Sequence, residues 1–266
     1  MKSKKLAIPY IIWLFAFTIV PLVLIATNAF QGSHGGFTLD NIAKAWSSEY
    51  LHALLYSLEI AFVSTLICLL LAYPASYIIS QMKARTQAII TMLITIPMWM
   101  NILLRLLGWY ILLQNGGPIH TVLSLLGIDA PILGTDAAVV LGMVYEFLPF
   151  MIMPLHTVMS KIDRSHIEAA QDLGANKFNI LRKVIFPLSV PGIVSGITMV
   201  FVPSASTFIV TKYLGGMHLM IGDYIEAAFL CADRNFGAAL ALTLMVIIII
   251  FMVITNRFGD EEAVGV

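Results

Sequence analysis

Long apolar runs separated by short polar segments dominate the chain. At about 1.5 Å of rise per helical residue, each run can cross a hydrocarbon core of roughly 30 Å, upright or tilted. The pattern predicts an all-α integral membrane protein whose residues 1–266 form a single transmembrane domain. We expect six transmembrane helices, at about residues 8–30, 53–80, 88–113, 136–159, 192–211 and 236–255.

The first apolar run, Leu6–Phe30, follows three lysines and has the outline of a signal peptide. It is too long for a typical signal-peptide core, so we interpret it as an uncleaved first transmembrane helix. Cleavage is the alternative, because small residues occur in the stretch from Ala26 to Ala29.

Three ionisable residues fall inside predicted spans: Glu59, Arg105 and Glu146. A charge at bilayer depth costs about 2.5–3.5 kcal/mol unless it is paired or hydrated. Counted along straight helices, Arg105 and Glu146 both lie about 12–15 Å deep and can pair. Two roles stay open for them: an ion pair that ties two helices together, or direct contact with a substrate.

The segment 160–190 is the longest polar segment with signs of regular structure. Ser165 and Glu168 have the spacing of a capping box, which predicts a helix start. Gly174 supplies the left-handed residue that ends a helix, and Asn176 is a suitable cap for a second one. We therefore predict two short helices that meet at a glycine corner.

The second of these helices carries an apolar stripe that has no partner within the segment. Phe178, Leu181 and Val184 lie on one side of it, and we expect Pro187 and Pro191 to end it. Such a stripe predicts a docking surface for another protein. An amphipathic helix pair lying on the membrane surface is the alternative.

Helix packing is indicated further along the chain. Gly192 and Gly196 are four residues apart, a spacing of small residues that lets two membrane helices approach closely. The polar segment that follows the fifth run contains Asp223 and Glu226.

Composition narrows the class of protein. With 59% hydrophobic and 11% charged residues, the chain is too apolar for a soluble domain, and its formal net charge of zero gives no sign of nucleic-acid binding. Cys68 and Cys231 lie far apart, so neither a disulfide framework nor a metal site is expected. We expect no cofactor in this chain.

Lysine and arginine are distributed unevenly between the two sides of the predicted membrane. With six spans, both termini lie on one side, which holds eleven basic residues against three on the other. Because basic residues favour the cytoplasmic side, we expect both termini and the segment 160–190 in the cytoplasm. The eleven are Lys2, Lys4, Lys5, Lys83, Arg85, Lys161, Arg164, Lys177, Arg182, Lys183 and Arg257, and the three are Lys44, Lys212 and Arg234.

The segment 160–190 resembles the cytoplasmic loop of ABC importer permeases, which has the pattern Glu-Ala-Ala, three residues, Gly, nine residues, Ile, any residue, Leu, Pro. The spacing matches throughout, with Val for Ile and Phe for Leu. The matching residues are Glu168, Ala169, Ala170, Gly174, Val184, Phe186 and Pro187.

This resemblance implies the type I ABC importer permease fold and a role for the loop in coupling to a separate ATPase. It also implies the partners: two copies of an ATP-binding subunit that holds ATP and Mg²⁺, a second homologous permease and an extracellular substrate-binding protein. It further implies that the protein is located in the inner or plasma membrane of a bacterium. The chain has no G-x-x-x-x-G-K-[ST] sequence, so we expect no ATPase site of its own and no enzyme activity.

Several less specific sequence stretches between about Ile94 and Leu242 look most like the B-subunit permeases of spermidine/putrescine importers. They include IPMWMNILLRLLGWYILLQNGGPIH, VYEFLPFMIMPL and FVPSASTFIVTKYLGG. The segment from Ala232 to Gly237 departs from that group, which tends to have Trp-Pro before Phe-Gly. The resemblance implies a polyamine as cargo.

A polyamine path needs carboxylates and aromatic faces, which bind ammonium groups. We hypothesise that Glu146, with Glu59, Trp109 and Tyr145, lines this path and that Arg105 lies beside it. The alternatives are a permease for another small solute and a secondary transporter driven by an ion gradient. A membrane-embedded enzyme is a further class, which lacks a nucleophile or metal cluster here.

Overall fold

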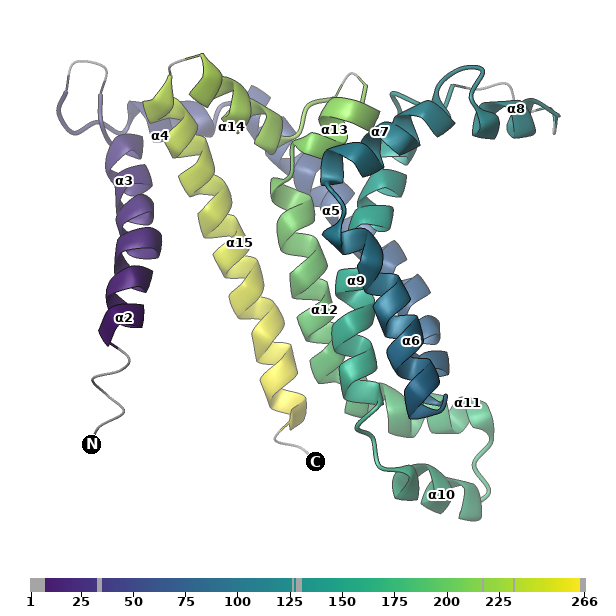
Figure 1. Cartoon of the computed structure of the whole chain (residues 1–266). Helices are drawn as coiled ribbons and strands as arrows, with labels where there is room; N and C mark the ends of the chain where they lie inside the picture. The colour runs from purple at the N-terminus through teal and green to yellow at the C-terminus, as the bar shows by residue number, and fades with distance from the viewer. Residues whose placement is uncertain are drawn as a thin grey trace.

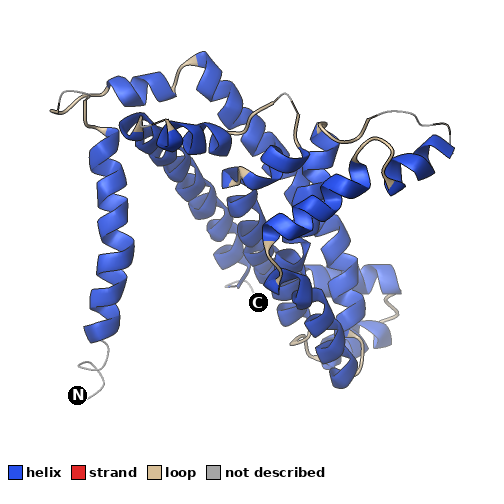
Figure 2. Ribbon diagram, turned by 45° about the horizontal axis from the view of Figure 1, so that its top comes forward, coloured by secondary structure: helices blue, strands red, loops and turns tan. Residues whose placement is uncertain are grey.

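The computed structural model describes residues 8–32, 35–125, 127, 131–216, 218–231 and 233–263. Within these ranges almost all regular structure is helical (Figure 2). This agrees with the predicted all-α class. Lys2, Lys4 and Lys5, which contributed to the predicted orientation, lie outside the described residues.

Long helices connect two ends of the molecule (Figure 1). We call the end that carries α10 (Arg164–Asp172) and α11 (Lys177–Ile180) the loop end. At the opposite end lie several short helices, which are α4 (Asp40–Ala45), α8 (Pro118–Leu125), α13 (Ile209–Leu214) and α14 (Ile221–Leu230).

Three long helices form the core: α5 (Ser48–Ser80), α9 (Asp136–Met159) and α12 (Phe186–Ser206), each of which packs against the other two. Met143, Met151 and Leu155 of α9 are fully buried among them. Because lipid tails are as apolar as these side chains, the packing relies on close fit rather than on water exclusion. The central helix α9 is therefore the frame on which the other elements are placed.

The two glycines of α12 make the close contact that their spacing predicts. A Cβ atom added at Gly196 would lie 2.5 Å from the Sδ atom of Met151, and one at Gly192 would lie 3.1 Å from Val158. Neither position has room for a side chain without movement of α9. The absence of a side chain therefore sets the distance between α12 and α9.

Five helices in the described part of the chain are long and apolar enough to cross a membrane, and a bent pair of helices brings the number to six if it counts as one span. This agrees with the predicted number. The five are Pro9–Ala29, Ser48–Ser80, Asp136–Met159, Lys177–Ser206 and Arg234–Arg257.

The bent pair replaces the single helix expected over residues 88–113. The first part is α6 (Ala84–Thr95) with a 3₁₀ turn η2 (Ile96–Trp99). After a bend of 91°, the second part begins with α7 (Ile102–Leu113) and continues to Leu125 at the end of α8. Pro97 cannot donate a backbone hydrogen bond, and Asn101 accepts one from the amide of Leu103 at 2.8 Å. The first helix therefore ends near Pro97, where a backbone donor is missing, and the second begins after its cap, Asn101.

The fifth span also differs from the expectation. A continuous helix runs from Lys177 through a π-helical turn η3 (Leu181–Ile185) to Ser206, so Pro187 and Pro191 do not end it. The π-helical turn just before Pro187 changes the hydrogen-bond pattern where the proline lacks a donor. At the other end Thr207 is extended, so the helix stops there and α13 is separate rather than part of a span to residue 211.

The first span stands apart from the rest of the molecule (Figure 1). It consists of α2 (Ile8–Leu14), a π-helical turn η1 (Phe15–Ile19) and α3 (Val20–Ala29). Its side chains are exposed along nearly its whole length, and Ala29 at its end packs against α15 (Arg234–Ala263). This helix has an apolar surface that the other described residues leave largely exposed.

Candidate functional site

The helix α10 at the loop end has its cap two residues earlier than expected. Asp163, not Ser165, is the cap: its carboxylate accepts a hydrogen bond from the amide of Ser165 at 3.0 Å. The predicted capping box of Ser165 with Glu168 is therefore wrong, since Ser165 already lies inside the helix. The same bond lowers the pKa of Asp163 below its usual value.

The glycine corner is confirmed. Gly174 has a φ of 79°, in the left-handed region where side chains are strained, and its amide donates to the carbonyl of Gln171. The next helix begins where predicted, because the side chain of Asn176 accepts from the amide of Asn179 at 2.8 Å. Two capped helices thus meet at a turn that only glycine adopts easily.

This loop is anchored on one side and open on the other. Ile180 and Ile185 are buried against the bundle, whereas Leu173 is 89% and Phe178 66% exposed. Large exposed apolar side chains on a short loop are suited to contact with another protein. Of the residues that match the permease pattern, Glu168, Ala169, Gly174, Phe186 and Pro187 are exposed, and Ala170 and Val184 are half-buried.

The second set of predicted residues lies between α7 and α9. Arg105 Nη2 is 2.5 Å from Glu146 Oε2, and the two side chains are only 8% and 2% exposed. The pairing that the sequence allowed is therefore present. It joins the bent helix α7 to the core helix α9 about 15 Å from the start of α9.

The aromatic residues predicted for the path lie beside this ion pair. The rings of Trp109 and Tyr145 meet edge to face, with centroids 5.4 Å apart. Trp109 is half-buried and Tyr145 is exposed. Glu59 is on a different helix, α5, where its side chain is exposed.

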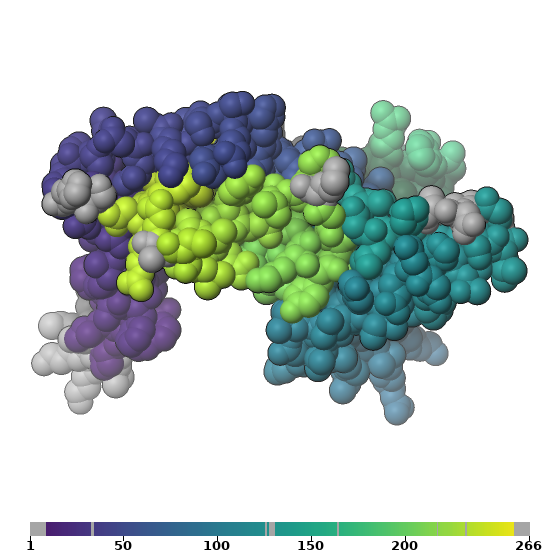
Figure 3. All heavy atoms as spheres, turned by 90° about the horizontal axis from the view of Figure 1, so that it is seen from above, coloured from purple at the N-terminus to yellow at the C-terminus, as the bar shows by residue number. Residues whose placement is uncertain are grey.

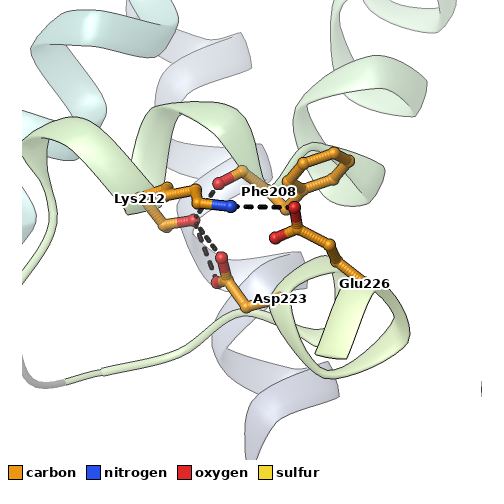
Figure 4. Close-up of polar contacts among 5 residues, drawn as sticks. Phe208, Lys212, Asp223 and Glu226 are labelled. Atoms are coloured by element: carbon orange, nitrogen blue, oxygen red, sulfur yellow. Dashed lines mark hydrogen bonds and ion pairs between the residues drawn. The ribbon is translucent and has the colours of Figure 1, made fainter. Parts of the chain in front are cut away.

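A polar network at the opposite end was not predicted from the sequence (Figure 4). Asp223 accepts hydrogen bonds from the hydroxyl of Thr211 at 2.9 Å and from the amide of Met220 at 2.8 Å. Burial raises the pKa of Asp223, against the effect of these hydrogen bonds. The bond from the Met220 amide could have been predicted, because Asp223 lies three residues after Met220, the spacing of a helix cap. The bond from Thr211 could not, because only the tertiary fold brings these two residues together.

Glu226, one turn further along α14, forms an ion pair with Lys212 at 2.8 Å (Figure 4). This hydrogen bond raises the pKa of Lys212. Asp223 and Glu226 therefore both contact side chains of α13, and these contacts join α13 and α14 at the opposite end.

Sequence comparison places the chain among transport proteins. Residues 72–260 match the family "binding-protein-dependent transport system inner membrane component". The spermidine/putrescine transport system permease protein PotB of Salmonella typhimurium is 37% identical over 92% of this chain and 89% of its own length. PotB of Escherichia coli is 36% identical over 92% of this chain and 93% of its own length.

Solved structures show the same fold at much lower identity. A bacterial ABC transporter that imports the acidic polysaccharide alginate has a chain that superposes with a TM-score of 0.82 over 97% of this chain and 95% of that one, at 16% identity. The MetNI methionine ABC transporter gives a TM-score of 0.54 over 79% and 93%. With the family match and the identities to PotB, this shows that the chain belongs to the binding-protein-dependent transport system inner membrane components and has the ABC importer permease fold.

Proposed function

We propose that this chain is the permease subunit of an ATP-driven ABC importer and carries a polyamine such as spermidine or putrescine. The observation that carries this proposal is the identity of 37% to a spermidine/putrescine permease over almost the full length of both chains. The chain transports and does not hydrolyse ATP. A separate ATPase supplies that activity.

The loop at the loop end docks to this ATPase. The exposed Leu173 and Phe178 supply apolar contacts, and the buried Ile180 and Ile185 connect the loop rigidly to α12. Since a continuous helix leads from Lys177 to Ser206, a push on the loop reaches the middle of the membrane. Two ATPase copies, with ATP and Mg²⁺, serve this chain and a second permease.

The loop end faces the cytoplasm of a bacterium, and the opposite end faces outward, in the inner or plasma membrane. The excess of Lys and Arg near the loop end supports this orientation. An external binding protein then delivers cargo to the end that carries α13 and α14. The exposed first span, Pro9–Ala29, is covered by the second permease.

The cargo passes the membrane along Glu59, Trp109 and Tyr145. Carboxylates attract ammonium groups, and Trp and Tyr faces bind them with about 0.5–2 kcal/mol each, weakly enough for release. Glu146 is 2% exposed and paired with Arg105, so it reaches cargo only when that ion pair opens.

The test uses the complete transporter in proteoliposomes, with Mg·ATP inside and loaded binding protein outside. We expect uptake of labelled putrescine or spermidine that requires ATP. Uptake of another solute in preference to polyamines would identify a different cargo. Uptake that continues without ATP in an ion gradient would indicate a secondary transporter.

The variants Gly174→Val and Glu168→Ala test the coupling loop. A β-branched residue at a φ of 79° is strained by about 1–2 kcal/mol, which should distort the corner and uncouple ATP hydrolysis from loaded binding protein. Gly116→Val is the matched control, because Gly116 has a φ of 80° at the opposite end. If both loop variants assemble and hydrolyse ATP like the wild type, the coupling role is wrong.

A further inference from the structure

A pocket of about 420 Å³ opens at the opposite end, between the start of α5 and the segment that includes α14. Figure 3 looks onto this end and shows the dark-blue start of α5 beside the yellow-green segment of α13 and α14. We call it the α5–α14 pocket. Its lining residues are Glu49, His52, Ala53, Tyr56, His218, Leu219 and Tyr224.

Two tyrosine rings of this pocket are held in place by other side chains. The hydroxyl of Tyr56 donates to Asp136 Oδ1 at 2.7 Å, and its ring lies 5.4 Å from that of His218. The ring of Tyr224 meets the ring of Tyr50 edge to face at 5.2 Å. Both aromatic surfaces are therefore fixed before any ligand arrives.

The charge of the pocket is negative when its histidines are neutral. Glu49 lies in the lining, Asp136 lies behind Tyr56, and none of the described lining residues is Lys or Arg. His218 Nδ1 is 3.7 Å from the Asp136 carboxylate. Burial, and next the charge of Glu49, raise the pKa of Tyr224, which keeps this phenol neutral. The chemistry is that of a cation site: carboxylates and neutral aromatic rings.

An independent observation extends this surface toward the membrane. His52, Tyr56 and Glu59 follow one another at spacings of four and three residues, which places them on one face of α5. Glu59 is exposed three turns into this helix, and no described residue forms an ion pair with it. Lipid tails do not accept a carboxylate, so this face meets water or protein. The face of α5 that leads from the pocket to Glu59 is therefore one that lipid does not cover.

We propose that the α5–α14 pocket receives an ammonium group of the cargo as it leaves the binding protein, and that Glu59 receives it next. This inference rests on the proposed function and adds its entry site. A polyamine is a flexible chain with two or more ammonium groups. One group can therefore contact Tyr56 and Glu49 while another reaches Glu59. A contact for a binding-protein side chain would explain the pocket, but it would not explain the exposed Glu59 further along the same face of α5.

The experiment compares variants of the complete transporter in proteoliposomes by polyamine taken up per ATP hydrolysed. Tyr56→Leu removes a ring, and Glu49→Gln removes a charge at the rim. Each should lower this ratio about two- to tenfold, the range expected for one lost cation–π or charge contact, while loaded binding protein still stimulates ATP hydrolysis. Tyr56→Phe keeps the ring but loses the hydrogen bond to Asp136, so it should lower this ratio less than Tyr56→Leu does. Asp40→Asn, an exposed carboxylate outside the pocket, is the control.

The outcomes separate the possible errors. If the wild type takes up no polyamine, the proposed function is wrong. If the wild type is active and Glu49→Gln and Tyr56→Leu match it, or if Tyr56→Phe is as impaired as Tyr56→Leu, the cargo pocket is wrong alone. If the variants lose capture of the binding protein and its stimulation of ATP hydrolysis, the pocket is a docking site instead. Should Tyr56→Leu fail to assemble, Glu49→Gln decides, because its side chain is exposed at the rim.

Discussion

Two ion pairs of similar length lie in opposite surroundings. Arg105–Glu146 is enclosed between α7 and α9, with side chains 8% and 2% exposed, whereas Lys212–Glu226 at the opposite end is 52% and 25% exposed. Inside, Arg105 Nε and Nη1 and Glu146 Oε1 have no hydrogen-bond partner among the described residues. At the surface, water supplies such partners.

The comparison shows that the same contact has a different role in each place. Removing one partner of a buried pair leaves the other as an isolated charge in a low dielectric. Most of the lost stability comes from this unpaired charge. An exposed pair loses little, because water and salt replace it. We therefore infer that the inner pair holds the bent helix α7 on α9. The outer pair contributes little to the contact between α13 and α14.

The largest expected effect follows from Glu146→Gln. Arg105 would keep its charge inside the protein, and breaking a buried pair in this way costs about 3–5 kcal/mol. We expect a strong loss of monodisperse transporter and a lower midpoint of thermal unfolding in detergent.

The double variant Glu146→Gln with Arg105→Gln provides the control, because it removes the isolated charge. We expect it to recover most of the lost assembly, with a coupling energy between the two sites well above that of a surface pair. If Glu146→Gln instead assembles normally and only uptake falls, contact with cargo outweighs the ion pair.

A smaller effect is expected at Asp223, which is next to the outer pair but half-buried. Asp223→Ala leaves the amide of the fully buried Met220 without an acceptor, which costs about 1–3 kcal/mol. Asp223→Asn retains an oxygen for this amide and should lose less. Thermal unfolding of the two variants measures the difference; equal losses would show that charge, not the hydrogen bond, matters there.

The sequence predicted features that depend on neighbouring residues. Gly174 at the corner and Gly196 at the α12–α9 contact were predictable because backbone strain and the spacing of small residues are local signals. The cap was misassigned because Asp163 and Ser165 are both good caps, and only the backbone decides between them.

Features that join distant segments were not predictable in the same way. The break at Pro97 and Asn101 lies within a run whose average hydropathy is that of one membrane span, so hydropathy alone predicted a single helix without the 91° bend. The α5–α14 pocket combines Tyr56 and His218, which are far apart in sequence, and only the packing of α5 against α14 brings them together.

The smallest effect is expected for the outer ion pair itself. Lys212→Met keeps much of the side-chain length without the charge, and Glu226→Gln keeps the shape of its partner. Each variant should change the free energy of unfolding by no more than about 1 kcal/mol. The coupling energy from a double-mutant cycle should also be no more than about 1 kcal/mol. At 1 M salt, where the Debye length is about 3 Å, the coupling should fall toward zero, while that of Arg105 and Glu146 should persist, because salt does not enter their enclosed contact. A salt-resistant coupling of several kcal/mol between Lys212 and Glu226 would mean that the opposite end is covered in the assembled transporter, and the contrast between the two pairs would disappear.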